Sequence, residues 1–209
     1  MLLIGNAQVR TTLNRAQLLA RGAKGGAALV LAGSVAEPLL GSAAAAPPPD
    51  ADLAYLRLLI GAELLAADFY TQAVAAKRFQ GAPLTYLKRA LFNEVEHYQA
   101  LSGILSGAGQ TPATPDDFDF SYPKGSFAAK ASIAKLGVTL ETVVLGAYLG
   151  AADGLQTHSL GQPVARVAAS EAQHLSLFTW MSGGDPIGIS FPNALSIDEA
   201  SNALDAYTS

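Results

Sequence analysis

Apolar residues recur every three or four positions through most of the chain after residue 50. Such spacing places them along one face of an α-helix. Glycine and proline interrupt the pattern at Gly81-Ala82-Pro83 and again from Ser182 to Pro186. The pattern predicts four long helices, which we expect at 50–79, 83–105, 127–156 and 161–181. Asp50 or Asp52 can cap the first of them.

The predicted connections set the topology. Short breaks separate helices one and two and helices three and four, whereas residues 110–126 form a long connection with three prolines and three aspartates. A connection of that length lets helix three start again at the far end of a bundle. Ser196-Ile197-Asp198-Glu199 matches a capping box and predicts a short fifth helix to about Tyr207. We therefore expect an all-α four-helix bundle with a long crossover and a short C-terminal helix.

Residues 1–49 differ from residues 50–209, which we expect to form one domain. Basic residues between Arg10 and Lys24 precede an apolar run at 25–36, alanines at 43–46 and three prolines. This order is typical of an export signal, and the run is too short to span a bilayer. The segment around Arg15 resembles a twin-arginine signal that lacks one arginine. The alternative is an N-terminal extension on an intracellular protein.

Four glutamates lie within the predicted apolar faces instead of opposite them. Glu63, for example, shares its face with Leu59, Ile60 and Tyr70. An ionised carboxylate without a partner in an apolar interior costs several kcal/mol, and no lysine or arginine occupies these faces. A compensating cation is therefore expected for the whole set, which is Glu63, Glu94, Glu141 and Glu171.

Two of these glutamates are followed by a histidine three residues later. Glu94 precedes His97, and Glu171 precedes His174, so each pair lies on one helix face and can reach the same inward point. The plan repeats, because 31 residues separate Glu63 from Glu94 and 30 separate Glu141 from Glu171. Two helical hairpins related by an approximate two-fold would bring all six side chains together. The alternative interpretation is that the six are polar core residues whose matching positions arose by chance.

Charge and composition narrow the choice of ions and partners that the protein could bind. Four carboxylates contribute −4, which two divalent cations balance. The chain has no cysteine, and oxygen-rich ligation with one imidazole per ion suits iron or manganese. A net charge of −4 without a basic run argues against nucleic acid as a partner. Glu63 and Glu141, the two lone glutamates without a histidine three residues later, are each followed by a tyrosine after seven residues, Tyr70 and Tyr148. These tyrosines are either hydrogen-bond or redox partners of the metals, or residues that simply fill the core.

Together these residues resemble the ferritin-like di-metal carboxylate superfamily, and within it the exported ferritin-like domain proteins that include the desiccation-related group. The resemblance covers about 52–207. It implies that Glu63 and His97 hold one ion and that Glu141 and His174 hold the other. Glu94 and Glu171 would bridge the two ions.

The resemblance also implies chemistry. Members of the superfamily oxidise ferrous iron, disproportionate peroxide with manganese, or activate dioxygen, so we expect small oxidants and metal ions as partners. The alternative is a non-catalytic stress-protective protein, or an iron-binding and storage protein, with a structural metal site. Assembly into homo-oligomers is compatible with either hypothesis.

Overall fold

The computed structural model describes residues 48–208. Within that range the chain forms one 3-10 turn (Pro115–Asp117) and no β-strand. Its α-helices are α2 (Asp50–Ala75), α3 (Gly81–Gly107), α4 (Lys130–Gly154), α5 (His158–Met181) and α6 (Ile197–Asp205). The predicted all-α fold with a short C-terminal helix is confirmed.

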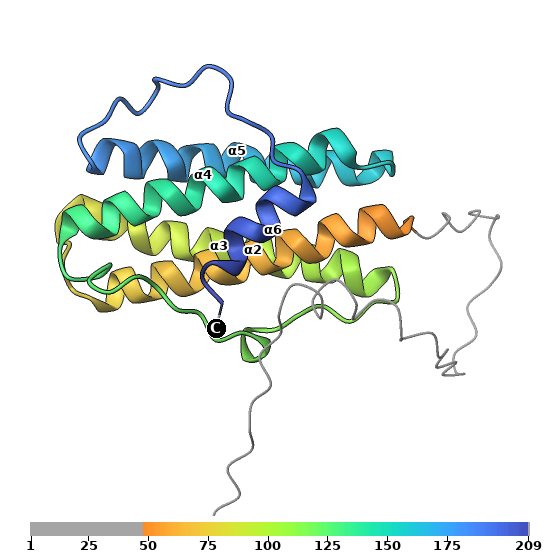
Figure 1. Ribbon diagram of the computed structural model, residues 1–209, viewed down its shortest axis with the longest axis horizontal. Helices are drawn as coiled ribbons and strands as arrows, with labels where there is room; N and C mark the ends of the chain where they lie inside the picture. The colour runs from red at the N-terminus through yellow and green to blue at the C-terminus, as the bar shows by residue number, and fades with distance from the viewer. Residues whose placement is uncertain (1–47, 209) are drawn as a thin grey trace, which may run out of the picture.

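The four long helices form two antiparallel pairs, α2 with α3 and α4 with α5 (Figure 1). The segment between α3 and α4 runs along the bundle and returns the chain to the end at which α3 began (Figure 1). Helices α2 and α4 also pack on each other, and α6 crosses both of them. The crossover thus makes α3 and α4 run in the same direction, and the two hairpins face each other across the bundle.

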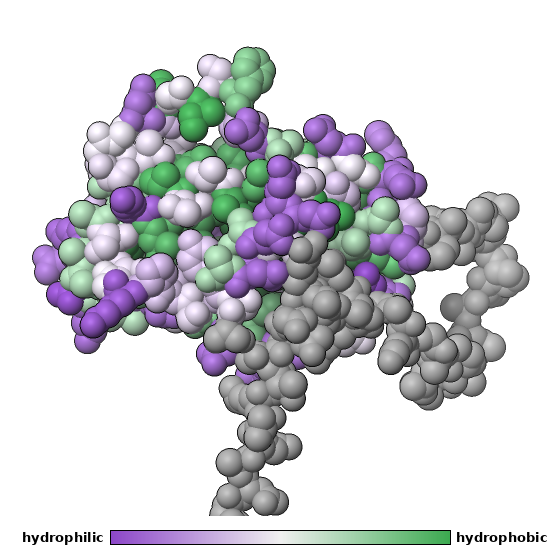
Figure 2. Space-filling view, in the orientation of Figure 1, coloured by the Kyte–Doolittle hydropathy of each residue, from purple (hydrophilic) through white to green (hydrophobic). Residues whose placement is uncertain are grey.

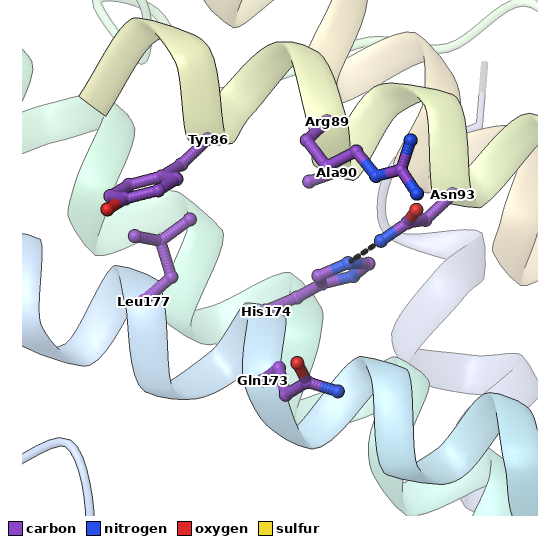
Figure 3. A pocket seen from close by; sticks show the side chains of 7 residues that line it. All are labelled: Tyr86, Arg89, Ala90, Asn93, Gln173, His174 and Leu177. Atoms are coloured by element: carbon purple, nitrogen blue, oxygen red, sulfur yellow. Dashed lines mark hydrogen bonds between the residues drawn. The ribbon is translucent and has the colours of Figure 1, made fainter. Parts of the chain in front are cut away.

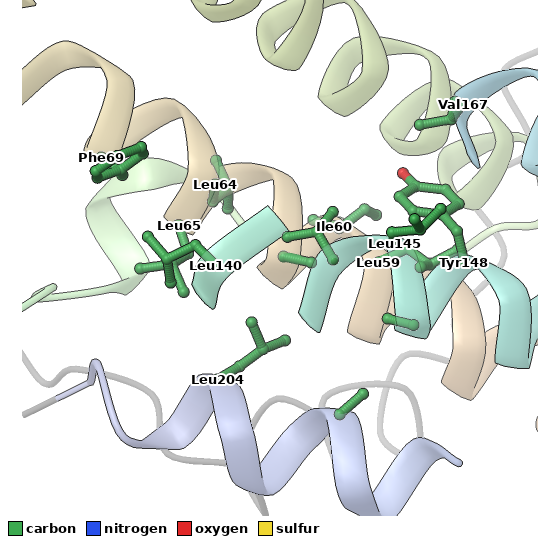
Figure 4. Packing of buried hydrophobic residues seen from close by; sticks show 14 of the residues in the cluster. Leu59, Ile60, Leu64, Leu65, Phe69, Leu140, Leu145, Tyr148, Val167 and Leu204 are labelled. Atoms are coloured by element: carbon green, nitrogen blue, oxygen red, sulfur yellow. The ribbon is translucent and has the colours of Figure 1, made fainter. Parts of the chain in front are cut away.

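One hydrophobic core runs through all four long helices, and part of it lies where α2 and α4 meet under α6. Leu65 of α2, Leu140 of α4 and Leu204 of α6 are at least nine-tenths buried, and Leu204 points from α6 toward α2 and α4 (Figure 4). Full burial of one such side chain stabilises the fold by about 1.5–3 kcal/mol. Because α2 and α4 are buried on several sides, their apolar residues extend beyond a single stripe.

The short helix α6 is fixed at its start by the predicted capping box. The Ser196 hydroxyl accepts a hydrogen bond from the Glu199 amide at 3.3 Å, and the Ser196 amide donates to the Glu199 carboxylate at 2.9 Å. Just before it, the Leu195 amide donates to the Gly146 carbonyl of α4 at 2.9 Å. A Cβ at Gly150, one turn further along α4, would lie only 1.8 Å from the Leu195 carbonyl oxygen. Glycine therefore permits this close approach.

Three predicted helix ends were wrong by three or four residues. The third helix begins at Lys130 and not near Phe127, because residues 124–129 form turns and bends. The first helix ends at Ala75, not near Phe79, because Lys77 adopts a left-handed conformation with φ of 54°. The fourth long helix begins at His158, three residues before the expected Gly161. Pro163 lies inside its second turn.

The predicted cap of the first helix was also wrong. Pro49 occupies the N-cap position of α2, and no side chain caps this end. Asp52 instead accepts hydrogen bonds from the backbone amides of Gln156 and Thr157 at 2.9 and 2.8 Å. The buried carboxylate of Asp52 therefore ties α2 to the turn between α4 and α5.

Helices α2 and α4 are long and apolar enough to cross a membrane, but 67% of the apolar window in each is buried inside the bundle. The described residues therefore give no clear transmembrane span. The connection between α5 and α6 projects from the bundle and carries exposed apolar side chains at Ile187, Ile189 and Phe191 (Figure 2). The export-signal-like stretch up to residue 47 lies outside the described residues.

Candidate metal centre

The six side chains singled out in the sequence come from all four long helices. Glu63 lies on α2 and Glu141 on α4, whereas α3 supplies Glu94 and His97 and α5 supplies Glu171 and His174. All four glutamates are at most 1% exposed. Helical periodicity explains this burial, because each glutamate occupies a position on the core-facing side of its helix.

These residues form two overlapping groups whose donor atoms lie within 4.8 Å of one another. One group is Glu63, Glu94, His97 and Glu171, and the other is Glu94, Glu141, Glu171 and His174. Glu94 and Glu171 belong to both groups. The structure thus brings all six side chains together and places the two shared carboxylates between the two histidines; that they bind metal stays a prediction.

Each histidine lies close to a glutamate of the other hairpin. Nδ1 of His97 lies 2.9 Å from Glu171 Oε1, and Nδ1 of His174 lies 2.8 Å from Glu94 Oε1. Each ring also lies 3.2–3.5 Å from the glutamate three residues before it on its own helix. The approximate two-fold expected from the spacing is therefore present in the arrangement of the side chains.

The inward-facing atoms have a marked deficit of hydrogen bonds. Five carboxylate oxygens of the four glutamates, together with His97 Nδ1, are buried without a hydrogen bond of suitable geometry among the described residues. Some of them, such as His97 Nδ1 and Glu171 Oε1, nevertheless lie within ion-pair distance of each other. Buried polar atoms are normally satisfied, and each unsatisfied one costs about 1–3 kcal/mol. Carboxylate oxygens and imidazole nitrogens are the donor set that iron and manganese take in proteins. The residues present therefore fit a pair of divalent cations.

Burial and mutual proximity shift the pKa values of these groups. Burial raises the pKa of Glu94, and the charge of Glu171 raises it further. Burial likewise raises the pKa of Glu141. For Glu171, burial acts in the same direction, but His174 and His97 outweigh it and lower its pKa to about 2.

The pKa values of the two histidines are raised by the carboxylates around them. Burial alone would lower the pKa of His97, but Glu171, Glu63 and Glu94 raise it to about 11. The pKa of His174 is raised as well, because Glu171 and Glu141 outweigh its burial. The proton that His97 holds thus offsets part of the negative charge that two cations would otherwise balance, and the raised pKa values of Glu94, Glu141 and His174 act in the same direction.

Two tyrosines support the lone glutamates from the opposite hairpin. The hydroxyl of Tyr70 on α2 donates a hydrogen bond to Glu141 on α4, and that of Tyr148 on α4 donates to Glu63 on α2. Both tyrosines are fully buried. Each bond occupies the Oε1 atom of its glutamate and leaves Oε2 without a partner. The tyrosines therefore orient these carboxylates toward the centre.

One polar contact of the centre escaped the sequence analysis. Asn93 Nδ2 lies 3.1 Å from Nε2 of His174, on the outer side of the ring (Figure 3). An asparagine within a helical pattern is not distinctive. Its position directly before Glu94 offered only a weak signal, because neighbours in a helix point about 100° apart.

Comparison with known proteins agrees with this arrangement. A protein family described as "Ferritin-like domain" matches residues 51–183, which include all six candidate ligands. The chain belongs to the ferritin-like domain family. No curated protein matches it.

A solved structure shares the ferritin-like fold over most of this chain. A hypothetical protein from Methanococcus jannaschii DSM 2661 superposes with a TM-score of 0.54. The match covers 85% of this chain and 100% of that protein, at 12% sequence identity. At this identity the likeness shows the fold alone.

Proposed function

We propose that this ferritin-like protein binds two divalent ions, iron or manganese, and carries out redox chemistry on Fe(II), dioxygen or hydrogen peroxide. The observation that carries the proposal is the pair of overlapping donor groups that share Glu94 and Glu171. A shared carboxylate holds two cations close enough to act on one small molecule. When bound, such a pair of ions would give two electrons to dioxygen or hydrogen peroxide and would take two electrons back from two Fe(II) ions or from a second hydrogen peroxide molecule.

The roles of the residues follow from their positions. Glu63 and His97 would hold one ion, Glu141 and His174 would hold the other, and Glu94 and Glu171 would be shared by both. Tyr148 and Tyr70 keep the terminal carboxylates turned inward. The apolar side chains around the centre keep out bulk water and strengthen each electrostatic interaction inside it.

Metal stoichiometry and turnover test the proposal together. Elemental analysis of protein purified from its native host should find two equivalents of iron or manganese. The loaded protein should consume Fe(II) and oxygen together or release oxygen from peroxide. Glu94→Gln should reduce both the bound metal and the turnover, whereas Glu96→Gln, an exposed neighbour on α3, should change neither. Full turnover in Glu94→Gln would contradict the proposal.

A second function is a structural metal site without turnover, in a stress-protective or storage protein. The burial of all four carboxylates favours it, because a closed site suits a structural ion. In that case removal of the metal should lower the melting temperature strongly, and the loaded protein should show neither ferroxidase nor peroxide-consuming activity. The same pair of measurements therefore separates the two functions.

The proposal includes export, as in the exported ferritin-like subgroup that the sequence resembles. It rests on the order of basic, apolar, small and proline residues within residues 1–49. Amino-terminal sequencing of the native protein should find a start near residue 47. An intact Met1 on intracellular protein would contradict this part of the proposal.

A further inference from the structure

A pocket of about 240 Å³ lies between α3 and α5, directly outside His174 (Figure 3). Tyr86, Arg89 and Asn93 line it from α3, and Gln173, His174 and Leu177 line it from α5. None of the four glutamates of the centre lines it. The pocket therefore meets the metal centre only through the ring of one histidine.

The polar groups of the pocket are predominantly hydrogen-bond donors. Nδ1 of His174 faces Glu94, so when Nδ1 binds an ion, Nε2 carries the ring proton and faces outward. Asn93 Nδ2 lies 3.1 Å from Nε2, and because two donors cannot bond each other, a protonated Nε2 donates either to the Asn93 amide oxygen after the amide turns or to an acceptor on a ligand that takes its place. The guanidinium of Arg89 also lines the pocket and lies 4.8 Å from the ring centre of Phe92. No aspartate or glutamate lines the pocket. These groups suit an anionic ligand.

The remaining walls are apolar or aromatic. Leu177 and Ala90 contribute hydrocarbon, and Tyr86 contributes its ring (Figure 3). A water molecule occupies roughly 30 Å³ in the liquid, so the volume admits a ligand of several non-hydrogen atoms. A guanidinium fork matches a carboxylate in geometry and in charge. The lining thus fits a carboxylate group with a short hydrocarbon chain.

We propose that this pocket binds a small organic carboxylate, which pairs with Arg89 and accepts a hydrogen bond from Nε2–H of His174. The inference rests on the proposed metal site, because Nε2 keeps its proton and the centre loses its net negative charge when two cations are bound. An anion at Nε2–H makes His174 a stronger ligand. Carboxylate and metal should therefore each strengthen the binding of the other by the same factor.

The test uses Co²⁺ as a spectroscopic metal and butyrate as the probe. Calorimetry of the Co²⁺-loaded full chain should show butyrate binding, and butyramide, which has the same shape without the charge, should bind much more weakly. Saturating butyrate should raise the Co²⁺ affinity, read from visible absorption, by about fivefold or more. Metal-free protein should bind butyrate more weakly by the same factor.

Matched charge variants assign the site. Arg89→Gln should weaken butyrate binding about tenfold or more, because it removes a charge-assisted hydrogen bond, and should leave Co²⁺ affinity without butyrate unchanged. Lys88→Gln removes the same charge from the preceding residue of α3, which does not line the pocket, and should have little effect.

The outcomes separate the two proposals. Failure to bind Co²⁺ would overturn the metal proposal and this coupling with it. Normal Co²⁺ binding without any butyrate effect would overturn the pocket proposal alone. Butyrate binding that Arg89→Gln and Lys88→Gln weaken equally would also overturn it, since the ligand would then respond to net charge or coordinate the metal directly.

Discussion

The hydroxyl of Tyr148 on α4 donates a hydrogen bond to Glu63 on α2, and Tyr70 makes the equivalent bond in the opposite direction to Glu141. Each central helix therefore supplies one carboxylate and the donor for the carboxylate of the other. This reciprocal pair couples the packing of α2 against α4 to the orientation of two candidate metal ligands. A shift of one helix along the other would disturb both carboxylates at once.

Removal of one tyrosine hydroxyl should weaken metal binding without unfolding the bundle. In Tyr148→Phe the ring still fills its place, but Glu63 Oε1 loses its donor and the carboxylate can turn. We expect the metal affinity to fall about 10–100-fold, which is usual for loss of a group that orients a ligand. Competition with a chromogenic chelator measures this affinity.

Tyr98→Phe is the matched control for this experiment. It removes a tyrosine hydroxyl that bonds the Ala113 carbonyl at 3.1 Å, outside the six candidate ligands. Its metal affinity should equal that of the wild type. An equal loss in both variants would mean that the effect comes from general destabilisation.

Metal binding should release protons. The neighbouring carboxylates raise the pKa of His97 to about 11, so this ring is protonated near neutral pH in the metal-free protein. An ion that binds its Nδ1 must displace that proton, and the metal affinity should therefore rise with pH up to that pKa. Calorimetry in buffers of different ionisation enthalpy counts the protons released.

Removing a histidine outside the centre provides the comparison. His158→Gln, at the start of α5, should leave the proton release unchanged. His97→Gln should lower it. Metal binding without proton release at neutral pH would contradict the expected charge state of the centre.

A methyl group at Gly150 should destabilise the protein. Its Cβ would lie 1.8 Å from the Leu195 carbonyl oxygen, so Gly150→Ala must displace the segment that leads into α6. Overpacking of this kind costs about 1–3 kcal/mol. Urea unfolding measures the loss.

Gly103→Ala in α3 is the control, and we do not expect it to lower the free energy of unfolding. A Cβ there would meet nothing within 4 Å, and alanine favours a helix over glycine by about 1 kcal/mol. Gly103→Ala should therefore be stabilising or neutral. If Gly150→Ala were equally well tolerated, the close approach of Leu195 to α4 would be disproved.

The Asp52 carboxylate should stabilise the fold in a pH-dependent way. Burial acts to raise its pKa, but the amides of Gln156 and Thr157 outweigh burial and lower it below the usual value. A lowered pKa in the folded state gives stability that is present above about pH 4 and is lost as the pH falls through the folded pKa. Asp52→Asn should therefore cost about 1–3 kcal/mol at pH 7 and less in acid.

The exposed Asp153 of α4 offers a matched comparison. Asp153→Asn should change the free energy of unfolding by less than about 0.5 kcal/mol. A difference between wild type and Asp52→Asn that stays constant from pH 7 to pH 3 would show that the charge of Asp52 contributes nothing.

The sequence by itself determined the helices and the face that each candidate ligand shares with the core. Helical periodicity acts within a few residues, so the positions of Glu94 and His97 relative to each other follow from their spacing. The capping box at Ser196 is equally local. The helix end near Lys77 was missed, because one left-handed residue ends a helix without changing the apolar pattern.

Only the tertiary structure decided which groups meet across the bundle. The sequence placed a tyrosine two turns after each lone glutamate, but only the packing of α2 against α4 pairs Tyr148 with Glu63. Helix packing also brings Asn93 to the outer side of the His174 ring, and it brings the Asp52 carboxylate of α2 to the backbone amide of Gln156, just before α5. These contacts depend on the register and separation of helices, which many distant apolar contacts set together, and no local pattern encodes them.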